Sequence, residues 1–273
     1  MPNDFNTPII EEFRANEGRV GGWFEGARLL LLTTTGRKSG RPHTVPLGYL
    51  PDGGERVLVI ASAAGAHHHP AWYHNLLAEP EVTVEDGAFT YAATATVLSG
   101  SERDRLFARA AESDPGWADY QAKTTRVLPV VALTAVPGPP RPNASSMGGA
   151  LKLIHDAFRR ELQVIRDEVA RSGSVLGAQL RVNCLTVCQG LQHHHTMEDR
   201  AMFPGVQRPG LEPVLDRLRA EHDQIAVLLA QLQEVLGDPG LGKDALAARV
   251  GELTAALDRH LDYEEQEIIP LIG

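Results

Sequence analysis

The chain has 273 residues, 43% hydrophobic and 22% charged, which is long enough for two domains with packed cores. Its formal net charge of -9 argues against general nucleic-acid binding, which requires a basic surface. Two cysteines, Cys184 and Cys188, are too few for a disulfide framework. With no signal peptide and no apolar run long enough to span a membrane, we expect a cytoplasmic protein.

Residues 1–137 are predicted to form a β-barrel with added helices. After a helical opening, IIEEFRANEG, the chain contains six short apolar runs that Gly, Pro and Asp bound, as is typical of strands. These runs are RLLLLTTT, HTVPLGYL, RVLVIAS, VTVED, YAATATVL and VLPVVALTAV. One helical stretch, SERDRLFARAAES, interrupts them. Many short strands with one or two helices favour a small β-barrel with appended helices.

A linker is predicted over residues 138–147, where Pro, Gly and Ser are concentrated. From residue 148 to residue 273, apolar residues recur at helical spacing in four blocks separated by Gly and Pro. Four amphipathic helices with short connections predict an all-α, up-down four-helix bundle. The predicted fold class is therefore multidomain, with an α+β barrel followed by a helical bundle.

Each predicted helix of the bundle places a histidine on its apolar face, and two helices add a glutamate one turn later. Burying four imidazoles and two carboxylates without compensation would cost several kcal/mol each. A bound cation removes that cost, so the sequence predicts a metal centre between the helices. Ligands of this kind without cysteine suit non-haem iron or manganese, with zinc as an alternative. The six predicted ligands are His155, His194, Glu198, His222, His260 and Glu264.

One of these ligands lies within a run of three consecutive histidines, residues 193–195. His194 is the predicted ligand, and His193 is expected to face solvent. His195 lies 100° further round the helix and could still reach the core, so its role stays open. The second run, residues 67–69, lies outside a regular helix and is predicted not to bind metal. Asp156, Asp199 and Glu265 each neighbour a ligand, and contacts that support the ligands are an alternative to the default interpretation of solvated charges.

The pieces IHDAF, HHTMEDRAMFP, RAEHDQI and HLDYEEQEIIP resemble, in order and spacing, the hemerythrin-like HHE cation-binding family. The resemblance covers about the last 125 residues and implies a non-haem di-iron centre that binds oxygen, nitric oxide or peroxide, or senses iron. In oxygen-carrying hemerythrins the third helix has a second histidine, where this chain has Ala226. The site therefore lacks the nitrogen ligand of that position, unless His195 or Glu265 takes its place as a ligand. This departure argues against reversible oxygen carriage and favours reaction.

Two stretches of the predicted barrel could hold a ligand. In TTTGRKSGRPHTVP, a predicted strand ends in Gly, and the loop that follows contains Arg37, Lys38, Ser39 and Arg41. Such a loop can bind a polyanion, or its charges are simply solvated. In IASAAGAHHHPAWYHNLL, small residues after a strand let a flat ligand approach the backbone. Trp72 could pack against such a ring or anchor the following helix.

The pieces EFRANEGRVGG, LLLLTTTGRKSGRPHTVPL, HPAWYHNL and YQAKTTRVLPVVAL closely resemble the deazaflavin-dependent nitroreductase family, which has a split β-barrel fold. The resemblance implies binding of coenzyme F420, a deazaflavin with a phosphate and an oligoglutamate tail. Tyr120 would then lie near the hydride-accepting substrate as the catalytic residue. The residues implied to contact the cofactor are Arg37, Lys38, Ser39 and Arg41 at the phosphate and tail, and Pro46, Leu47, Ala61, Ser62, Ala63, Ala64 and Trp72 around the ring.

The two resemblances together imply an F420-dependent oxidoreductase. The leading hypothesis couples oxidation of the reduced deazaflavin to a non-haem di-iron centre that reduces oxygen, peroxide or nitric oxide. A first alternative is an F420-dependent quinone or nitro reductase with an independent oxygen- or iron-sensing bundle. A second alternative is a deazaflavin- and iron-binding protein without turnover. The expected partner is a small-molecule acceptor (oxygen, a quinone or a nitro compound), and a homodimer stays open because split barrels often dimerise.

Overall fold

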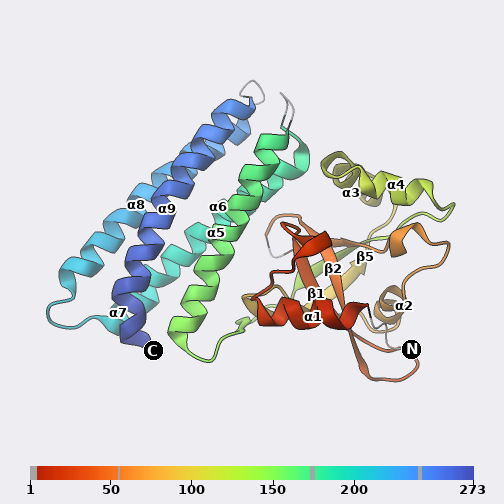
Figure 1. Cartoon of the computed structure of the whole chain (residues 1–273), viewed down its shortest axis with the longest axis horizontal. Helices are drawn as coiled ribbons and strands as arrows, with labels where there is room; N and C mark the ends of the chain where they lie inside the picture. The colour runs from red at the N-terminus through yellow and green to blue at the C-terminus, as the bar shows by residue number, and fades with distance from the viewer. Residues whose placement is uncertain (1–4, 55, 173–175, 239–241) are drawn as a thin grey trace. The chain divides into compact units, whose positions relative to one another are not determined.

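The computed structural model describes residues 5–54, 56–172, 176–238 and 242–273. The chain forms two compact units. The first consists of the residues up to Asn143 together with Gly177–Gln179, and the second consists of Ala144–Leu176 and Leu180–Gly273. Strands dominate the first unit, and helices make up the second (Figure 1). Every helix in the described part of the chain is too short or too polar to span a lipid bilayer.

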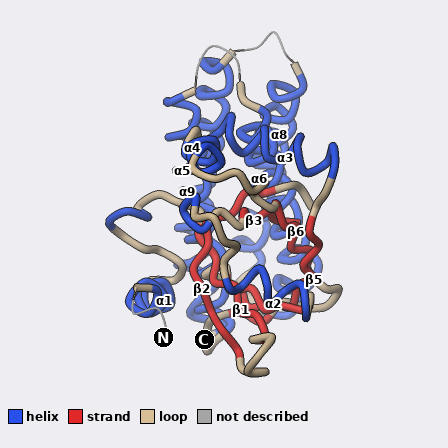
Figure 2. Tube along the Cα trace, turned by 90° about the vertical axis from the view of Figure 1, so that its right-hand side faces the viewer, coloured by secondary structure: helices blue, strands red, loops and turns tan. Residues whose placement is uncertain are grey.

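Six antiparallel strands close the barrel of the first unit (red in Figure 2). They pair in the order β4-β1-β2-β3-β6-β5, and an additional pairing of β4 with β5 closes the ring. Each strand coincides with one of the six apolar runs, so the predicted barrel is confirmed. The strands are β1 (Leu29–Thr35), β2 (Pro42–Pro51), β3 (Arg56–Ile60), β4 (Glu81–Glu85), β5 (Phe89–Val97) and β6 (Val130–Ala135).

Strand β1 is buried on both faces, which explains its uninterrupted run of leucines. Leu30 and Leu32 belong to the cluster that fills the barrel interior. Leu29 and Leu31 point the other way, because successive side chains of a strand alternate between its faces, and pack in a cluster with Phe13. Phe13 belongs to helix α1 (Asn6–Ala15). The opening helix therefore covers the outer face of β1.

The remaining helices of the first unit are short. They are η1 (Gly22–Phe24), η2 (Ala63–Gly65), α2 (Ala71–Ala78), α3 (Gly100–Ser113) and α4 (Gly116–Ala122). Helix α3 coincides with the helical stretch predicted from the sequence, and Leu106 on it packs in a second apolar cluster with Leu58 and Leu128. Trp117 and Tyr120 of α4 pack against the same cluster.

The segment predicted as a linker contains some regular structure. Arg141–Pro142 forms a two-residue strand, β7, that pairs with Phe89 and Thr90 of β5. The next residue, Asn143, accepts a hydrogen bond from the Thr90 hydroxyl (2.7 Å) and donates one to the carbonyl of Gly87 (3.1 Å). Composition alone could not show this, because proline is compatible with an edge strand as well as with a linker.

Four long helices of the second unit run alternately up and down (Figure 1), so the predicted bundle is confirmed. The backbone amide of Gly148 donates to the carbonyl of Gly273 at 3.0 Å, which joins the start of the first helix to the end of the last. The elements are α5 (Met147–Arg171), α6 (Ala178–Met197), a π-helical turn (Glu198–Met202), α7 (Phe203–Val206), α8 (Glu212–Gly237) and α9 (Lys243–Ile272).

Replacing Leu31 by alanine should lower the free energy of unfolding of the barrel by about 2–5 kcal/mol, because a fully buried leucine leaves a cavity. Trp23, Trp72 and Trp117 are the chain's three tryptophans, and all lie in the first unit, so their fluorescence during urea unfolding follows this unit alone. Leu77→Ala removes the same atoms from a side chain that is 56% exposed and should cost less than about 0.5 kcal/mol. Equal losses would contradict the position of Leu31 in the core.

Candidate metal centre and cofactor loops

The alternating direction of the bundle helices brings the four predicted histidine ligands to one level. His155 and His222 lie in the first halves of α5 and α8, whereas His194 and His260 lie in the second halves of α6 and α9. All four side chains are at least nine-tenths buried. Since neighbouring helices run in opposite directions, early positions on two of them meet late positions on the other two.

Apolar clusters lie on both sides of this level. The larger one contains Leu162, Ile165, Cys184, Cys188 and Leu257, so the two cysteines are small core residues. The smaller one consists of the buried residues Leu151, Phe203, Leu215, Leu218 and Ile268. The histidine level is therefore a polar layer inside an apolar core.

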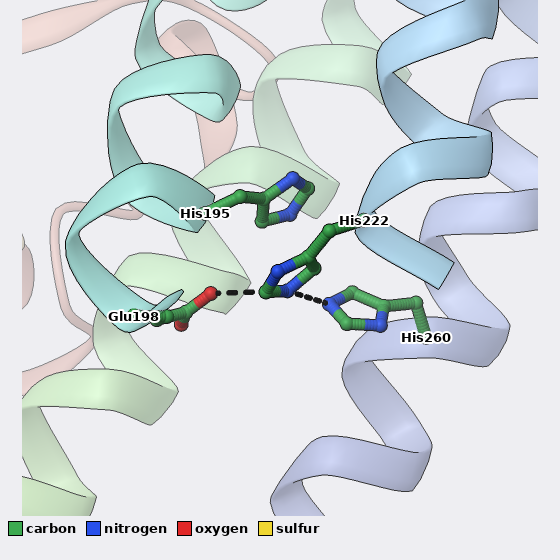
Figure 3. A group of neighbouring side chains, drawn as sticks. All are labelled: His195, Glu198, His222 and His260. Carbon is green, nitrogen blue, oxygen red and sulfur yellow. Dashed lines mark hydrogen bonds and ion pairs between the residues drawn. The ribbon is translucent and has the colours of Figure 1, made fainter. Parts of the chain in front are cut away.

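Two groups of possible metal-binding side chains lie in this layer, and Glu198 belongs to both. One group joins Glu198 to His155 and His194, and the other joins it to His195, His222 and His260. Within each group the ligand atoms all lie within 4.8 Å of one another. Figure 3 shows the second group converging from the end of α6 and from α8 and α9.

The sixth predicted ligand, Glu264, is fully buried beside both groups. Its Oε2 atom lies 3.6 Å from Nε2 of His155 and 3.6 Å from Nε2 of His260. The structure thus brings all six predicted ligands together and adds His195. His193 is exposed, as expected. Ala226 is also exposed, so α8 offers no second inward-facing side chain there.

Seven of the inner atoms of the cluster make no hydrogen bonds. Buried atoms without a hydrogen-bond partner are Nε2 of His155, His194 and His195, and both carboxylate oxygens of Glu198 and Glu264. Nε2 of His194 and Oε1 of Glu198 lie 2.9 Å apart but are not aligned for a hydrogen bond. A buried polar atom without a partner costs about 1–3 kcal/mol. A cation coordinated by these atoms would remove the cost, so the donor set fits a metal ion.

Carboxylates outside the cluster hold the other nitrogen of three histidines. Nδ1 of His155 lies 3.0 Å from Glu265, Nδ1 of His222 lies 3.0 Å from Asp199, and Nδ1 of His260 lies 3.0 Å from Glu221. An ionised carboxylate can only accept a hydrogen bond, so each Nδ1 carries the proton. Each Nε2 then presents a lone pair to the interior, which is the arrangement found in metal-binding histidines.

The Nε2 atoms of His222 and His260 lie 3.1 Å apart (Figure 3). With both protons on Nδ1, these atoms face each other with two lone pairs, which repel without a proton or cation between them. Two imidazole nitrogens bound at right angles to one ion, each at about 2.1 Å, lie roughly 3 Å apart. The observed separation therefore suits two ligands of one metal ion.

The electrostatics of the layer also favour a cation. Burial and the nearby charge of Glu198 raise the pKa of Glu264 to about 10. Burial alone would raise the pKa of Glu198, but its close polar contacts with His155 and His194 lower it below its usual range. One carboxyl is therefore neutral when no cation is present, and a cation would let both ionise. Burial and the neighbouring His222 lower the pKa of His195 to about 2, which keeps its imidazole neutral.

In the barrel, the four predicted polyanion-binding residues lie together in the exposed loop between β1 and β2. The residue that fixes this loop was missed from the sequence. Asn75 of α2 is buried, accepts a hydrogen bond from the backbone amide of Arg37 (3.1 Å) and donates one to the hydroxyl of Thr34 (3.0 Å). Asn75 therefore fixes the backbone at the start of the loop. The side chains of Arg37, Lys38, Ser39 and Arg41 remain exposed.

The predicted small-residue turn follows β3, and Ala63 and Ala64 adopt positive φ values of 46° and 53°. Arg126 holds this turn. Its guanidinium donates to the carbonyls of Ala61 (3.0 Å), Ser62 (2.6 Å) and Ala66 (2.8 Å). Sequence reasoning missed this role, although Arg126 belongs to one of the quoted motifs.

The other predicted barrel residues differ in exposure. Pro46 and Leu47 are half-buried on β2, and Tyr120 is half-buried on α4. Trp72 is 5% exposed and packs inside the barrel cluster, which corresponds to the anchoring alternative for this side chain.

In the histidine run of residues 67–69, Nδ1 of His69 lies 3.0 Å from the guanidinium of Arg126.

Comparisons with known proteins match both units. The family described as F420H(2)-dependent quinone reductase matches residues 9–135, and the family described as hemerythrin HHE cation binding domain matches residues 148–272. An F420H(2)-dependent quinone reductase of Mycobacterium tuberculosis, Rv1261c, is 38% identical over 126 residues, which cover 45% of this chain and 84% of that protein.

Two solved structures also resemble the barrel unit in sequence. One, an F420-H2 dependent reductase (FDR-A), is 40% identical and is matched over 39% of this chain and 93% of its own, with a TM-score of 0.36. The other, described as a domain-swapped dimer, is 37% identical over 46% and 92%, with a TM-score of 0.38. The two family matches confirm both resemblances seen in the sequence. The chain therefore belongs to the F420H(2)-dependent quinone reductase family of oxidoreductases through its first unit, and carries a hemerythrin HHE cation binding domain in its second.

Proposed function

We propose that this chain oxidises reduced F420 in its barrel and couples that oxidation to a non-haem di-iron centre in its bundle that reduces oxygen. The observation that carries the proposal is the pairing, in one chain, of a barrel from an F420H(2)-dependent family with a buried cluster whose inner atoms lack partners. Peroxide and nitric oxide are further acceptors of the same class. The predicted homodimer stays a prediction.

The barrel supplies the features that a deazaflavin requires. The exposed cations of the β1–β2 loop suit the phosphate and the carboxylates of the tail, because guanidinium groups bind such oxygens in pairs. The turn at Ala61–Ala64 has small side chains, which would let a flat ring approach its backbone. Arg126 holds the backbone of that turn in place through three carbonyls. Tyr120, half-buried on α4, is proposed to contact the hydride acceptor.

The bundle supplies ligands and excludes water. The inward Nε2 atoms and the unpaired oxygens of Glu198 and Glu264 are proposed to hold two ions. The outer carboxylates keep each imidazole in the tautomer that can ligate. Iron bound there would exchange single electrons with oxygen. Reduced F420 gives up two electrons and two protons, which balance the reduction of one oxygen molecule to hydrogen peroxide.

A second function is favoured by one specific observation. The mycobacterial quinone reductase is matched over 84% of its length by the barrel unit alone. The barrel of this chain is then an F420-dependent quinone or nitro reductase that works without the bundle, and the bundle senses oxygen or iron. The two functions differ in whether F420 oxidation depends on iron.

Arg37→Ala should weaken F420 binding by about tenfold or more, because a charge-assisted hydrogen bond contributes about 1.5–3 kcal/mol. The iron content should not change. Arg105→Ala, which removes the same charge from an exposed site on α3, is the matched control and should bind F420 like the wild type. Fluorescence titration of the deazaflavin measures both affinities. Wild-type affinity in Arg37→Ala would refute the predicted contact with the phosphate or tail.

His194→Ala and Glu198→Ala should each lower the iron content below that of the wild type, because each removes an inward-facing ligand atom. F420 affinity should stay unchanged in both variants. The control is His193→Ala, an exposed neighbour on the same helix. Iron is measured by metal analysis after dialysis against a weak chelator. Unchanged iron content in both ligand variants would rule out the proposed ligands.

Removing iron should slow the oxygen-dependent oxidation of reduced F420 by at least about tenfold, if the two units form one oxidase. Stopped-flow absorbance of oxidised deazaflavin measures the rate with oxygen and, separately, with a quinone. Glu198→Ala should behave like the iron-free wild type. If the oxygen-dependent rate is the same with and without iron, the coupling is refuted. Rapid turnover with a quinone alone would then assign the second function.

A further inference from the structure

His195 lies inside the bundle, beside the histidines of the two later helices. Its ring stacks on that of His222, with the centroids 4.2 Å apart, and meets that of His260 edge-on at 5.2 Å. Figure 3 shows this arrangement next to Glu198. The side chain is 6% exposed, and its Nε2 atom is buried without a hydrogen-bond partner. A neutral imidazole in this position has an uncompensated polar atom directed into the metal cluster.

We propose that His195 is a metal ligand and supplies the nitrogen that α8 lacks. This inference rests on the iron centre of the proposed function. The centre is then asymmetric, with three imidazoles around one ion and two around the other. The first set is His195, His222 and His260, and the second is His155 and His194.

The orientation of Glu198 supports this division. Its Oε1 atom lies 2.9 Å from Nε2 of His194 and 3.8 Å from Nε2 of His155. Its Oε2 atom lies 3.4 Å from Nε2 of His222. One carboxylate oxygen therefore faces each set of histidines, so Glu198 could supply a donor atom to either ion. His195 belongs to the set that the second oxygen faces.

Adjacent residues on α6 can belong to different sets because their side chains point in different directions. His194 packs against Phe158 and His155 of α5, with ring centroids 5.3 and 5.2 Å away. His195 lies about 100° further round and turns toward α8 and α9 instead. The two side chains thus diverge from the end of α6, immediately before the π-helical turn. Such turns often occur at functional sites.

The other candidate for the additional ligand, Glu265, has a different role. Its Oε1 atom lies 3.0 Å from Nδ1 of His155 and 2.6 Å from the guanidinium of Arg159. It therefore contacts the outer nitrogen of an imidazole, and a cation already balances its charge. Glu265 therefore positions His155. Of the two candidates for the additional ligand, only His195 remains.

The test measures iron binding and the iron environment in the purified full-length protein, without F420. We expect His195→Ala to bind one of the two ions at least about tenfold more weakly, since even removing groups that support a metal ligand costs this much. In Mössbauer spectra, only one of the two iron signals should change. Added imidazole should restore both results, because it can occupy the space left by the ring. His193→Ala, the exposed neighbour, should match the wild type.

Wild-type affinities and an unchanged spectrum in His195→Ala would overturn the assignment of His195 and leave the iron centre in place. A weakened site that imidazole does not restore would show a packing role and would overturn it equally. A wild-type protein that binds no iron would instead refute the proposed function. If circular dichroism shows that His195→Ala loses helix, His195→Gln, which fills more of the space without an imidazole, is measured for iron affinity and Mössbauer signals alone.

Discussion

The burial of ionisable side chains in the middle of the bundle is the constraint on which the second unit depends. Five imidazoles and two carboxylates lie between two apolar clusters, and seven of their inner atoms lack a partner. At about 1–3 kcal/mol for each such atom, the cost is comparable with the whole stability of a typical domain, about 5–15 kcal/mol. A coordinated cation removes this cost, because it gives each of these atoms a partner. Iron binding and folding of the bundle are therefore expected to be linked.

The cluster is built in shells that extend to the surface. The inward Nε2 atoms form the centre, and carboxylates hold the Nδ1 atoms around it. Arginines hold two of these carboxylates in turn. Arg159 lies 2.6 Å from Glu265, and Arg217 lies 2.8 Å from Glu221. Each shell fixes the orientation of the one inside it, so imidazole geometry is set before a metal binds.

Much of this organisation could be predicted from the sequence, because the periods of helix and strand are short and regular. The six apolar runs became strands, and the 3.6-residue period placed the four helix histidines on buried faces. The sequence raised Asp199 and Glu265 as possible supports of the ligands, but it could not assign their partners and it missed Glu221, since each outer carboxylate holds a histidine from another helix. Glu221 precedes His222 in the chain but contacts His260. Local sequence carries no signal for such a contact.

The sequence left the role of His195 open and missed that of Arg126, and both outcomes have the same physical cause. A side chain at the edge of a helix face or in the loop before a strand has several accessible directions, and its partners alone decide between them. His222 of α8 and His260 of α9 contact the ring of His195 and orient it into the cluster. Three carbonyls of a distant turn offer Arg126 a place, and their hydrogen bonds offset the backbone strain of Ala63 and Ala64 at positive φ. In both units, the proposed site is completed by a residue that only the tertiary fold can orient.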